Sequence, residues 1–555
     1  MLRVGISGRR VVQASLASLL VVALLAPAMV LAQVTPQPAS PVCAALERVF
    51  ADPEPIPAQR PLDWPTLSRV YRGHDYGPFW LGDHGPRSRA GQLLTVLRHA
   101  GEHGLDPADY HLQTLERLWP ASSSIARARL DILLTDALIR YGRDLWTGRL
   151  DPAEAQPAWH VEREAFDPRA MLLLALSSTD LYGLLEDLAP RIAIYRRLQQ
   201  ALRRYRAIAR AGGWPEIPEG PLLERGDQDP RVHAITERLL ATGDLRHRGT
   251  EPCMYGAAVE QAVRRFQRRH GLEVDGIVGP ETRAAMNMPV SQRLAQIQLN
   301  LDRWRWLPRD LDERYILVNA AGFRLHAVAD GDPIVTMKVI VGKPYRETPA
   351  FSERMTHIVI NPRWNVPDSI ARKDLLPKQQ ADPDHFQQMG IRVLESWAPD
   401  AREFDPETIN WDALSRSHFP YRLQQEPGPR NALGRLKFML PNRFDIYLHD
   451  TPARHLFQRS RRTFSSGCIR LEEPLALAEF VLADEAWDLP DLRRLIASGE
   501  TRTIHLSRAL PVYLLYFTVW VDEDGMIRFA RDVYHRDQAS VSAFEESRGP
   551  SGSVR

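Results

Sequence analysis

The stretch Ser465-Ser466-Gly467-Cys468-Ile469-Arg470-Leu471 places a cysteine directly after a glycine, and His449 precedes that cysteine by nineteen positions. A thiol attacks carbonyl carbon as the thiolate, and an ordinary thiol is mostly protonated at neutral pH. A nearby histidine can take the proton, and a cation such as Arg470 favours the anion. Because glycine permits a tight turn, we expect the amides of Gly467 and Cys468 to face a developing oxyanion. The stretch therefore predicts a cysteine nucleophile with His449 as its base.

Other interpretations of these residues remain open at this point. An ordinary buried cysteine beside an unrelated histidine is the first, since cysteine is among the most buried residue types. Asp450 follows His449 directly, but adjacent side chains on a strand point to opposite faces, so a backbone carbonyl is expected to orient the ring instead. His455 is an alternative base, in the predicted loop before Cys468. Arg470 is expected to shape the turn or to bind a substrate carboxylate rather than to move protons.

Composition narrows the class of protein. A chain of 555 residues is too long for one hydrophobic core and predicts three or four domains. The formal net charge of +2 argues against nucleic acid as a partner. The cysteines are isolated and no HExxH motif occurs, so neither a metal site nor a cofactor is expected.

The N-terminus predicts export. Arg3, Arg9 and Arg10 precede an apolar run from 11 to 25, and Val30-Leu31-Ala32 offers small residues for a signal peptidase. We therefore predict a signal peptide at 1–32. An uncleaved membrane anchor is the alternative, because the apolar run is near the length that spans a bilayer.

Three cysteines in an exported chain leave at least one thiol unpaired or shared between chains. Cys468 is the natural free thiol. Whether Cys43 and Cys253 pair is left open, because sequence does not show that their Cα atoms approach each other.

The order of patterns along the chain gives a multidomain α+β protein. Residues 33–43 are a proline-rich linker, and 44–220 have the apolar period of helices, which predicts a helical scaffold. Residues 221–290 predict a separate small helical unit, and 291–540 a mainly-β domain.

Two segments depart from the strand pattern of the mainly-β domain. Residues 368–428 are polar and interrupt it, so we predict an inserted cap or lid. Residues 541–555, rich in Ser, Glu and Gly, are predicted to form a disordered tail.

The small unit carries a family resemblance. Its Ala262-Val-Arg-Arg-Phe-Gln267 and Asp275-Gly-Ile-Val-Gly-Pro-Glu-Thr282 segments resemble those of the three-helix peptidoglycan-binding domain. The resemblance implies binding to the cell wall, while the spacing alone shows a compact helical module.

Residues 315–537 resemble the YkuD-type L,D-transpeptidase catalytic domain. The motifs that carry the resemblance are Asn361-Pro-x-Trp-Asn-Val-Pro, Asn431-Ala-Leu-Gly434, Tyr447-Leu-His449-Asp450-Thr-Pro and Ser465-Ser-Gly-Cys468-Ile-Arg470. The overall order resembles the large periplasmic, YcbB-like form, which implies a periplasmic location in a Gram-negative bacterium. Many relatives have His where this chain has Ser466, and Gly where it has Asp450.

The resemblance also implies roles for particular residues. The expected catalytic set is Cys468, His449, Gly467, Ser466 and Arg470. The expected substrate-binding set lies along a groove and consists of Tyr447, Trp364, Asn365, Asn431 and Gly434. For Tyr447 and Trp364 a place in the hydrophobic core is the competing interpretation.

The implied activity is transfer between peptidoglycan stem peptides. Cys468 attacks the L-to-D bond of a donor tetrapeptide at meso-diaminopimelate, D-alanine leaves, and an amine of an acceptor stem receives the acyl group in a 3→3 cross-link. Acylation by a carbapenem is expected on the same grounds. An L,D-carboxypeptidase or cysteine amidase that trims stems is one alternative, and a non-catalytic wall-binding scaffold is another. The sequence names no protein activator.

Overall fold

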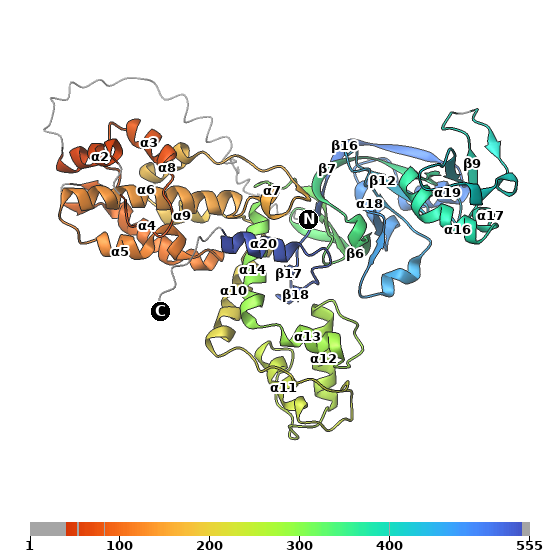
Figure 1. Cartoon of the computed structure of the whole chain (residues 1–555), viewed down its shortest axis with the longest axis horizontal. Coiled ribbons are helices and arrows are strands. Elements are labelled where there is room, and N and C mark those ends of the chain that lie inside the picture. The colour runs from red at the N-terminus through yellow and green to blue at the C-terminus, as the bar shows by residue number, and fades with distance from the viewer. Residues whose placement is uncertain (1–39, 53–54, 83, 399, 547–555) are drawn as a thin grey trace, which may run out of the picture.

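The computed structural model describes residues 40–52, 55–82, 84–398 and 400–546 (Figure 1). The predicted signal peptide and most of the linker lie outside these residues, as does 547–555. A helical body and the inserted segment occupy opposite ends of the long axis, with the small helical unit below the centre. Within the described ranges, no helix is both long and apolar enough to cross a membrane. The predicted multidomain α+β class is confirmed.

The helical scaffold is built around α6 (Ser124–Thr147), which is buried along most of its length. Ser123 caps its first turn by accepting a hydrogen bond from the amide of Ala126. Around it lie α2 (Pro41–Ala51), α3 (Trp64–Arg72), α4 (Ser88–Arg98), α5 (Leu112–Leu118), α7 (Pro152–Ala155), α8 (Pro168–Ser177), α9 (Leu181–Glu186) and α10 (Ala193–Arg210), with short strands β1 (Leu81–Gly82), β2 (Gly85–Pro86) and β3 (Trp159–His160).

The end of the predicted linker is helical, which corrects the boundary at residue 43. Helix α2 begins at Pro41, and the hydroxyl of Ser40 accepts from the amide of Val42. Serine at the cap followed by proline in the first turn favours a helix start, a signal hidden by the proline-rich composition. Cys43 on this helix and Cys253 in the small unit are both free thiols, so the two do not pair.

The small unit has its own core around α11 (Arg231–Ala241), α12 (Ala257–Arg269) and α13 (Pro280–Asn287). Gln267 explains its sequence signature. Its amide nitrogen donates to Asp275 Oδ1 at 2.7 Å and to Thr282 Oγ1 at 3.1 Å, while its oxygen accepts from the amide of Gly276 at 2.8 Å. The residues of the motif therefore hold the connector between α12 and α13 in place.

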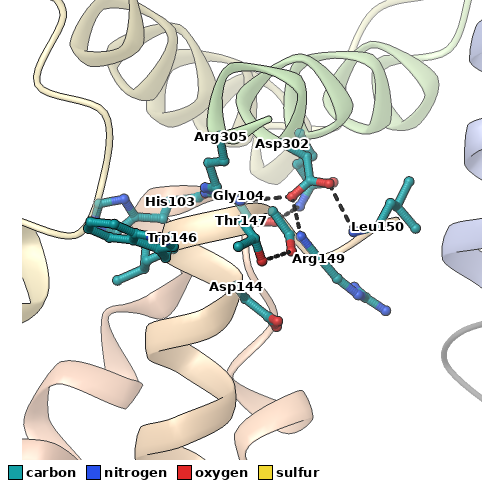
Figure 2. Close-up of polar contacts among 12 residues, drawn as sticks. His103, Gly104, Asp144, Trp146, Thr147, Arg149, Leu150, Asp302 and Arg305 are labelled. Atoms are coloured by element: carbon teal, nitrogen blue, oxygen red, sulfur yellow. Dashed lines mark hydrogen bonds and ion pairs between the residues drawn. The ribbon is translucent and has the colours of Figure 1, made fainter. Parts of the chain in front are cut away.

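Helix α14 (Val290–Arg305) joins the small unit to the scaffold and packs into the scaffold core. Figure 2 shows the buried polar junction at its end. Asp302 accepts from the amides of Arg149 at 2.7 Å and Leu150 at 3.1 Å, and Arg305 Nη1 donates to it at 3.1 Å. A Cβ on Gly148 would lie 2.5 Å from the indole nitrogen of Trp306, so the chain approaches closely there. The scaffold is thus locked onto α14.

The C-terminal mainly-β region is a sheet that closes on itself, because β12 pairs with both β13 and β7. Its core contains apolar residues from most of its strands and is covered by α18 (Pro474–Val481) and α19 (Leu489–Ser498). The strands are β4 (Arg314–Asn319), β5 (Arg324–Ala329), β6 (Asp332–Gly342), β7 (Ala350–Ile360), β12 (Leu436–Met439), β13 (Leu448–His449), β14 (Thr463–Ser465), β15 (Ile469–Leu471) and β16 (Arg502–Leu515).

The predicted domain boundaries separate the scaffold from the sheet, but in the structure the two regions share a strand pairing and a hydrophobic core. Strand β3 of the scaffold pairs in parallel with β7. The hairpin of β17 (Val519–Val521) and β18 (Ile527–Phe529) buries its apolar residues in the scaffold core. The chain then forms α20 (Arg536–Glu546), so the predicted disordered tail is wrong for residues 541–546.

The inserted segment is a folded unit with its own hydrophobic core. It contains a four-stranded sheet, which the polar sequence did not indicate. Its elements are β8 (Trp364–Asn365), α15 (Asp368–Ile370), the π-helical turn η5 (Ala371–Leu375), α16 (Leu376–Ala381), α17 (His385–Met389), β9 (Ile391–Leu394), β10 (Glu403–Phe404), η6 (Pro406–Thr408), η7 (Trp411–Ala413) and β11 (Arg422–Gln425).

Candidate active site

Strand register places the candidate catalytic side chains on one face of the closed sheet. Leu448 pairs with Ile469 in parallel, and both side chains are buried in the core. Because side chains alternate along a strand, their neighbours point the other way. This opposite face carries Lys437, Tyr447, His449, Cys468 and Arg470.

The turn before Cys468 is held by a short ring of hydrogen bonds. Gly467 adopts a φ of 120°, which glycine accommodates best, and its carbonyl accepts from Thr348 Oγ1 at 2.7 Å. Its amide donates to Ser465 Oγ at 3.1 Å, and that hydroxyl donates to the carbonyl of Cys468 at 2.6 Å. The Gly467 amide is therefore engaged, contrary to the expected role in an oxyanion hole.

The Cys468 amide differs from that of Gly467. In the part of the chain that the structure describes, it has no hydrogen-bond acceptor. It is therefore the amide of this turn that can donate to a developing oxyanion.

The thiol of Cys468 is partly buried and protonated at rest. Its Sγ lies 3.7 Å from the carbonyl oxygen of Asp445. Burial raises the pKa of the thiol, whereas hydrogen bonding by Tyr447 and the charges of Lys437 and Arg470 lower it. Without the opposing groups, burial alone would leave the thiol unreactive.

His449 is buried and neutral. Its Nδ1 lies 2.5 Å from the carbonyl oxygen of Asp450, so Nδ1 carries the proton of the neutral ring, and the backbone of Leu433 also hydrogen-bonds to the ring. Burial is the main cause that lowers its pKa to about 3, and the charge of Arg470 adds to this effect. The expectation that a backbone carbonyl orients this ring is confirmed. No hydrogen bond joins His449 to Cys468 within the described ranges.

Asp450 and His455, the other two residues considered beside His449, lie in different environments. The Asp450 carboxylate accepts from the amides of Arg435 at 2.8 Å and Thr451 at 2.6 Å, and pairs with Arg454. His455 is exposed on the short helix η8 (Arg454–Gln458). His449 is thus the histidine on the strand that pairs with β15, which begins directly after Cys468.

Lys437 is a residue of the site that sequence reasoning missed. It pairs with His449 across β12 and β13, and its Nζ lies 4.0 Å from the centroid of the Tyr447 ring. Burial lowers the pKa of Lys437, while the charge of Cys468 raises it. A lysine between the buried Leu436 and Phe438 was the available signal, but only the register places it beside His449.

Arg470 is a half-buried cation without a carboxylate partner among the described residues. Its Nε is buried and has no hydrogen-bond partner there. Burial lowers its pKa, and the charge of Cys468 acts in the opposite direction. The side chain is therefore available to an anionic group of a ligand.

Four of the five predicted groove residues make contacts within the fold. Trp364 is 9% exposed and lies in the core of the inserted unit. Asn365 lies on the exposed side of that unit, where its Oδ1 accepts from Gln424 Nε2 at 2.8 Å. Asn431 is buried and donates to the carbonyls of Pro362 and Glu426.

Gly434 lies against the carboxylate of Asp450. A Cβ there would come within 2.3 Å of the Asp450 side chain, and the φ of Gly434 is 64°. Only Tyr447 of the predicted groove set lies at the catalytic face. It also packs against the core of the inserted unit, so it connects the two.

A second contact joins the inserted unit to the nucleophile turn. Arg346, from the short helix η4 (Pro344–Arg346), donates to Ser466 Oγ at 2.8 Å and forms an ion pair with Asp374 of the π-helical turn η5. Ser466 itself is exposed. Arg346 was not predicted from sequence, because its two partners are remote along the chain.

Comparison with known proteins assigns families to three segments. Residues 65–202 match a model described as "Scaffold domain", 228–286 one described as "Putative peptidoglycan binding domain", and 313–503 one described as "L,D-transpeptidase catalytic domain".

A curated relative from Haemophilus influenzae, named "Putative L,D-transpeptidase", is 36% identical over 249 residues. The match covers 45% of this chain and spans about half, 49%, of that relative.

Solved structures are more distant. An L,D-transpeptidase from Mycobacterium smegmatis is 12% identical, with a TM-score of 0.18, over 37% of this chain and 58% of that one. One from Xylanimonas cellulosilytica is 16% identical, with a TM-score of 0.16, over 54% of this chain and all of that one. At these scores the likeness supports no further conclusion. The family models, in contrast, match the segments that hold the fold and the cysteine site: the chain carries an L,D-transpeptidase catalytic domain, together with a scaffold domain and a peptidoglycan-binding domain.

Proposed function

We propose that the protein is a peptidoglycan L,D-transpeptidase that uses Cys468 as its nucleophile. The observation that carries the proposal is the shared face of Cys468, His449, Tyr447, Lys437 and Arg470, inside the segment that matches the catalytic-domain model. A cysteine acyltransferase needs a thiol, a neutral base and cations that favour the thiolate, and this face supplies all three.

The first step transfers the thiol proton to Nε2 of His449. The neutral ring accepts it, because Nδ1 already donates to the carbonyl of Asp450. Substrate entry must first bring the thiol from the carbonyl of Asp445 into reach of His449, since active-site hydrogen bonds often tighten only in the complex. The positive charges of Lys437 and Arg470 then favour the thiolate. They also lower the pKa of His449, so the imidazolium readily gives its proton to a leaving amine.

The thiolate attacks the carbonyl carbon of meso-diaminopimelate in a donor tetrapeptide, and the C–O π bond becomes an oxyanion. The free amide of Cys468 donates to that oxygen. The C–N bond then breaks, the imidazolium protonates the departing amine of D-alanine, and a thioester remains on Cys468. An acceptor stem amine attacks the thioester, His449 removes its proton, and the 3→3 cross-link forms as the thiol is regenerated.

Arg470 is proposed to bind a carboxylate of the donor stem. Its buried Nε has no partner in the described part of the protein, and it lies in register with His449. A buried guanidinium gains most from a charged acceptor. Ser466 is proposed to position the turn through Arg346 rather than to contact the reacting atoms.

Export to the periplasm, through a signal peptide at 1–32, is part of the same proposal because the substrate lies outside the cytoplasm. Hydrolysis of the thioester by water would give L,D-carboxypeptidase activity on the same site.

Mass spectrometry of the intact protein tests the acylation half-reaction. After incubation with a disaccharide tetrapeptide, we expect a covalent adduct on the peptide containing Cys468, with one D-alanine released per adduct. A carbapenem is expected to block adduct formation by acylating the same thiol. An adduct on Cys43 or Cys253 with none on Cys468 would contradict the assignment of the nucleophile.

A further inference from the structure

A cavity of about 320 Å³ lies between the small helical unit and the closed sheet. One wall is the end of α12 with the loop to Val274, and the other is formed by β5 and the hairpin of β17 and β18. The segment 457–462, which leads towards the nucleophile, closes one side. None of the five residues of the catalytic face lines it, so it is a separate cavity.

The lining of this junction cavity is strongly basic. It includes Arg268, Arg324, Arg459, Arg461, Arg462 and Arg528, whereas Glu273 is the acidic residue that lines it. The chain as a whole carries a net charge of only +2, so this is a local concentration of positive charge. Such a cavity attracts anions.

Several of these cations lack a carboxylate partner among the described residues. Arg528 pairs with Asp522, and Lys338 with Glu472. Arg324 forms no ion pair there, although the charges of Asp522 and Glu472 act on it.

The guanidinium of Arg462 donates to backbone carbonyls only, those of Phe323, Val339 and Arg459. Burial, with the charge of Arg324 next in effect, lowers the pKa of Arg462 to about 10. The positive charges of Arg324 and Arg462 thus repel each other, and a bound anion would relieve that repulsion.

Apolar and aromatic groups lie beside the cations. Arg462 stacks over Phe323, with its Cζ 5.2 Å from the ring centroid. His326 stacks on Trp520 at a centroid distance of 4.9 Å, and both line the cavity. Val274 is exposed at the edge. A bare inorganic anion would leave these surfaces uncovered, whereas a peptide that carries carboxylates on aliphatic side chains would cover them.

We propose that the junction cavity binds the carboxylates of a second peptidoglycan stem peptide, outside the active site. The identity of the ligand rests on the proposed function; the anionic class rests on the cavity itself. Arg461 and Arg462 lead directly into β14, which pairs with β6 and ends two residues before Gly467. A stem peptide bound in the cavity would therefore contact the same chain segment that carries Cys468.

Calorimetric titration of the full chain tests this site. In the Cys468→Ala background, which prevents turnover, we expect a soluble disaccharide tetrapeptide to bind at two sites. The exposed pair Arg459→Glu/Arg461→Glu is expected to remove one site. Arg324→Gln should weaken the same site at least tenfold without lowering the melting temperature, because it removes an unpaired, repelled charge.

The matched control is Arg493→Glu/Arg508→Glu, which makes the same change in net charge at exposed arginines away from the cavity. It should keep both sites. A tetrapeptide with amidated carboxylates should lose the cavity site and should also bind the active site more weakly, since Arg470 is proposed to hold a donor carboxylate there. Unchanged binding in the cavity variants would overturn the proposal. Equal occupation of the cavity by inorganic phosphate, with displacement of the tetrapeptide, would overturn the assignment to a stem peptide.

The two proposals fail in different ways. If Cys468 is not the nucleophile, the cavity variants still lose binding. If the cavity is not a stem site, its variants bind and react like the wild type. With sacculi as substrate we expect the cavity variants to raise KM severalfold at unchanged kcat, since the catalytic face is intact.

Discussion

Two polar regions of this chain, one buried and one partly buried, differ in whether their charged side chains have charged partners. At the junction of scaffold and α14, Asp302 accepts from two backbone amides and from Arg305 (Figure 2). The guanidinium of Arg305 also donates to the hydroxyl of Tyr195. On the catalytic face, Lys437 and Arg470 have no carboxylate partner in the described residues, and the Nε of Arg470 has no partner at all.

The presence or absence of a charged partner distinguishes groups that stabilise the fold from groups that are available to a ligand. A buried charge that is paired and hydrogen-bonded fixes one geometry, and removal of its partner is costly. A buried cation without a partner is unfavourable in the free protein, so its presence needs a compensating role. At the catalytic face the proposed role is stabilisation of the Cys468 thiolate and of substrate carboxylates.

His449→Gln is expected to have the largest effect on catalysis. Loss of the base should reduce kcat by about 10²–10⁴-fold, because the thiol and the leaving amine lose their proton carrier. Steady-state release of D-alanine measures this. The melting temperature should change little, since glutamine can also donate to the carbonyl of Asp450. An activity within threefold of the wild type would contradict the assignment of His449.

Asp302→Asn is expected to act on stability instead. It leaves Arg305 without its charged partner and turns an amide group towards the backbone donors of Arg149 and Leu150, which should cost about 3–5 kcal/mol of unfolding free energy. Denaturant unfolding measures the loss. The control is Asp187→Asn, in a surface ion pair with both side chains 58% exposed, which should cost less than about 1 kcal/mol. Equal losses of unfolding free energy in Asp302→Asn and Asp187→Asn would contradict the view that the buried pair stabilises the fold.

Lys437→Met is expected to raise the pKa of Cys468 further. A positive charge beside the thiol favours the thiolate, so its removal leaves fewer thiolates at a given pH. Each unit of pKa corresponds to about tenfold in thiolate population below the pKa. The rate of alkylation of Cys468, followed as a function of pH by peptide mass spectrometry, should therefore shift to higher pH. A shift to lower pH would contradict the proposed role.

The pH dependence of wild-type activity also tests the proposed protonation states of Cys468 and His449. Burial raises the pKa of Cys468 and lowers that of His449 to about 3. Since the first step uses the neutral thiol–imidazole pair, activity should be nearly constant around neutral pH. It should show no limb near pH 6–7, because His449 is already neutral there. A limb near 6.5 would show that His449 titrates as an ordinary histidine.

Asp374→Asn is expected to have the smallest effect. It weakens the ion pair with Arg346 that ties the inserted unit to the turn at Ser466, so KM should change severalfold with kcat nearly constant. Arg372→Gln, which removes a weak surface pair with Asp368, is the control. Equal cross-linking by a protein without residues 368–428 would contradict the lid interpretation.

Much of the fold was predictable because it depends on local pattern. The helical period in 44–220 and the alternation in the strands indicated the domain order, and Ser465–Arg470 with His449 indicated the nucleophile and the base. The start of α2 was missed because a proline-rich composition conceals the Ser40 cap. The sheet of the inserted unit was missed because its strands are two to four residues long.

The rest of the site depends on register, which one strand alone does not reveal. Lys437 faces the site because it pairs with His449, and Arg346 reaches Ser466 across 120 positions of the chain. Conversely, Trp364, Asn431 and Gly434 belong to the sequence motif because they hold the inserted unit and Asp450 in place. A motif marks residues that are needed, without saying whether a ligand or the fold needs them.

The central claim is that Cys468 forms the acyl intermediate from which a 3→3 cross-link is made. The most direct measurement is mass analysis of muropeptides after incubation of tetrapeptide-rich sacculi with the purified full chain and with Cys468→Ala. We predict 3→3 dimers with release of D-alanine for the wild type, and neither product for the variant. Equal amounts of 3→3 dimers from the two proteins would contradict the account.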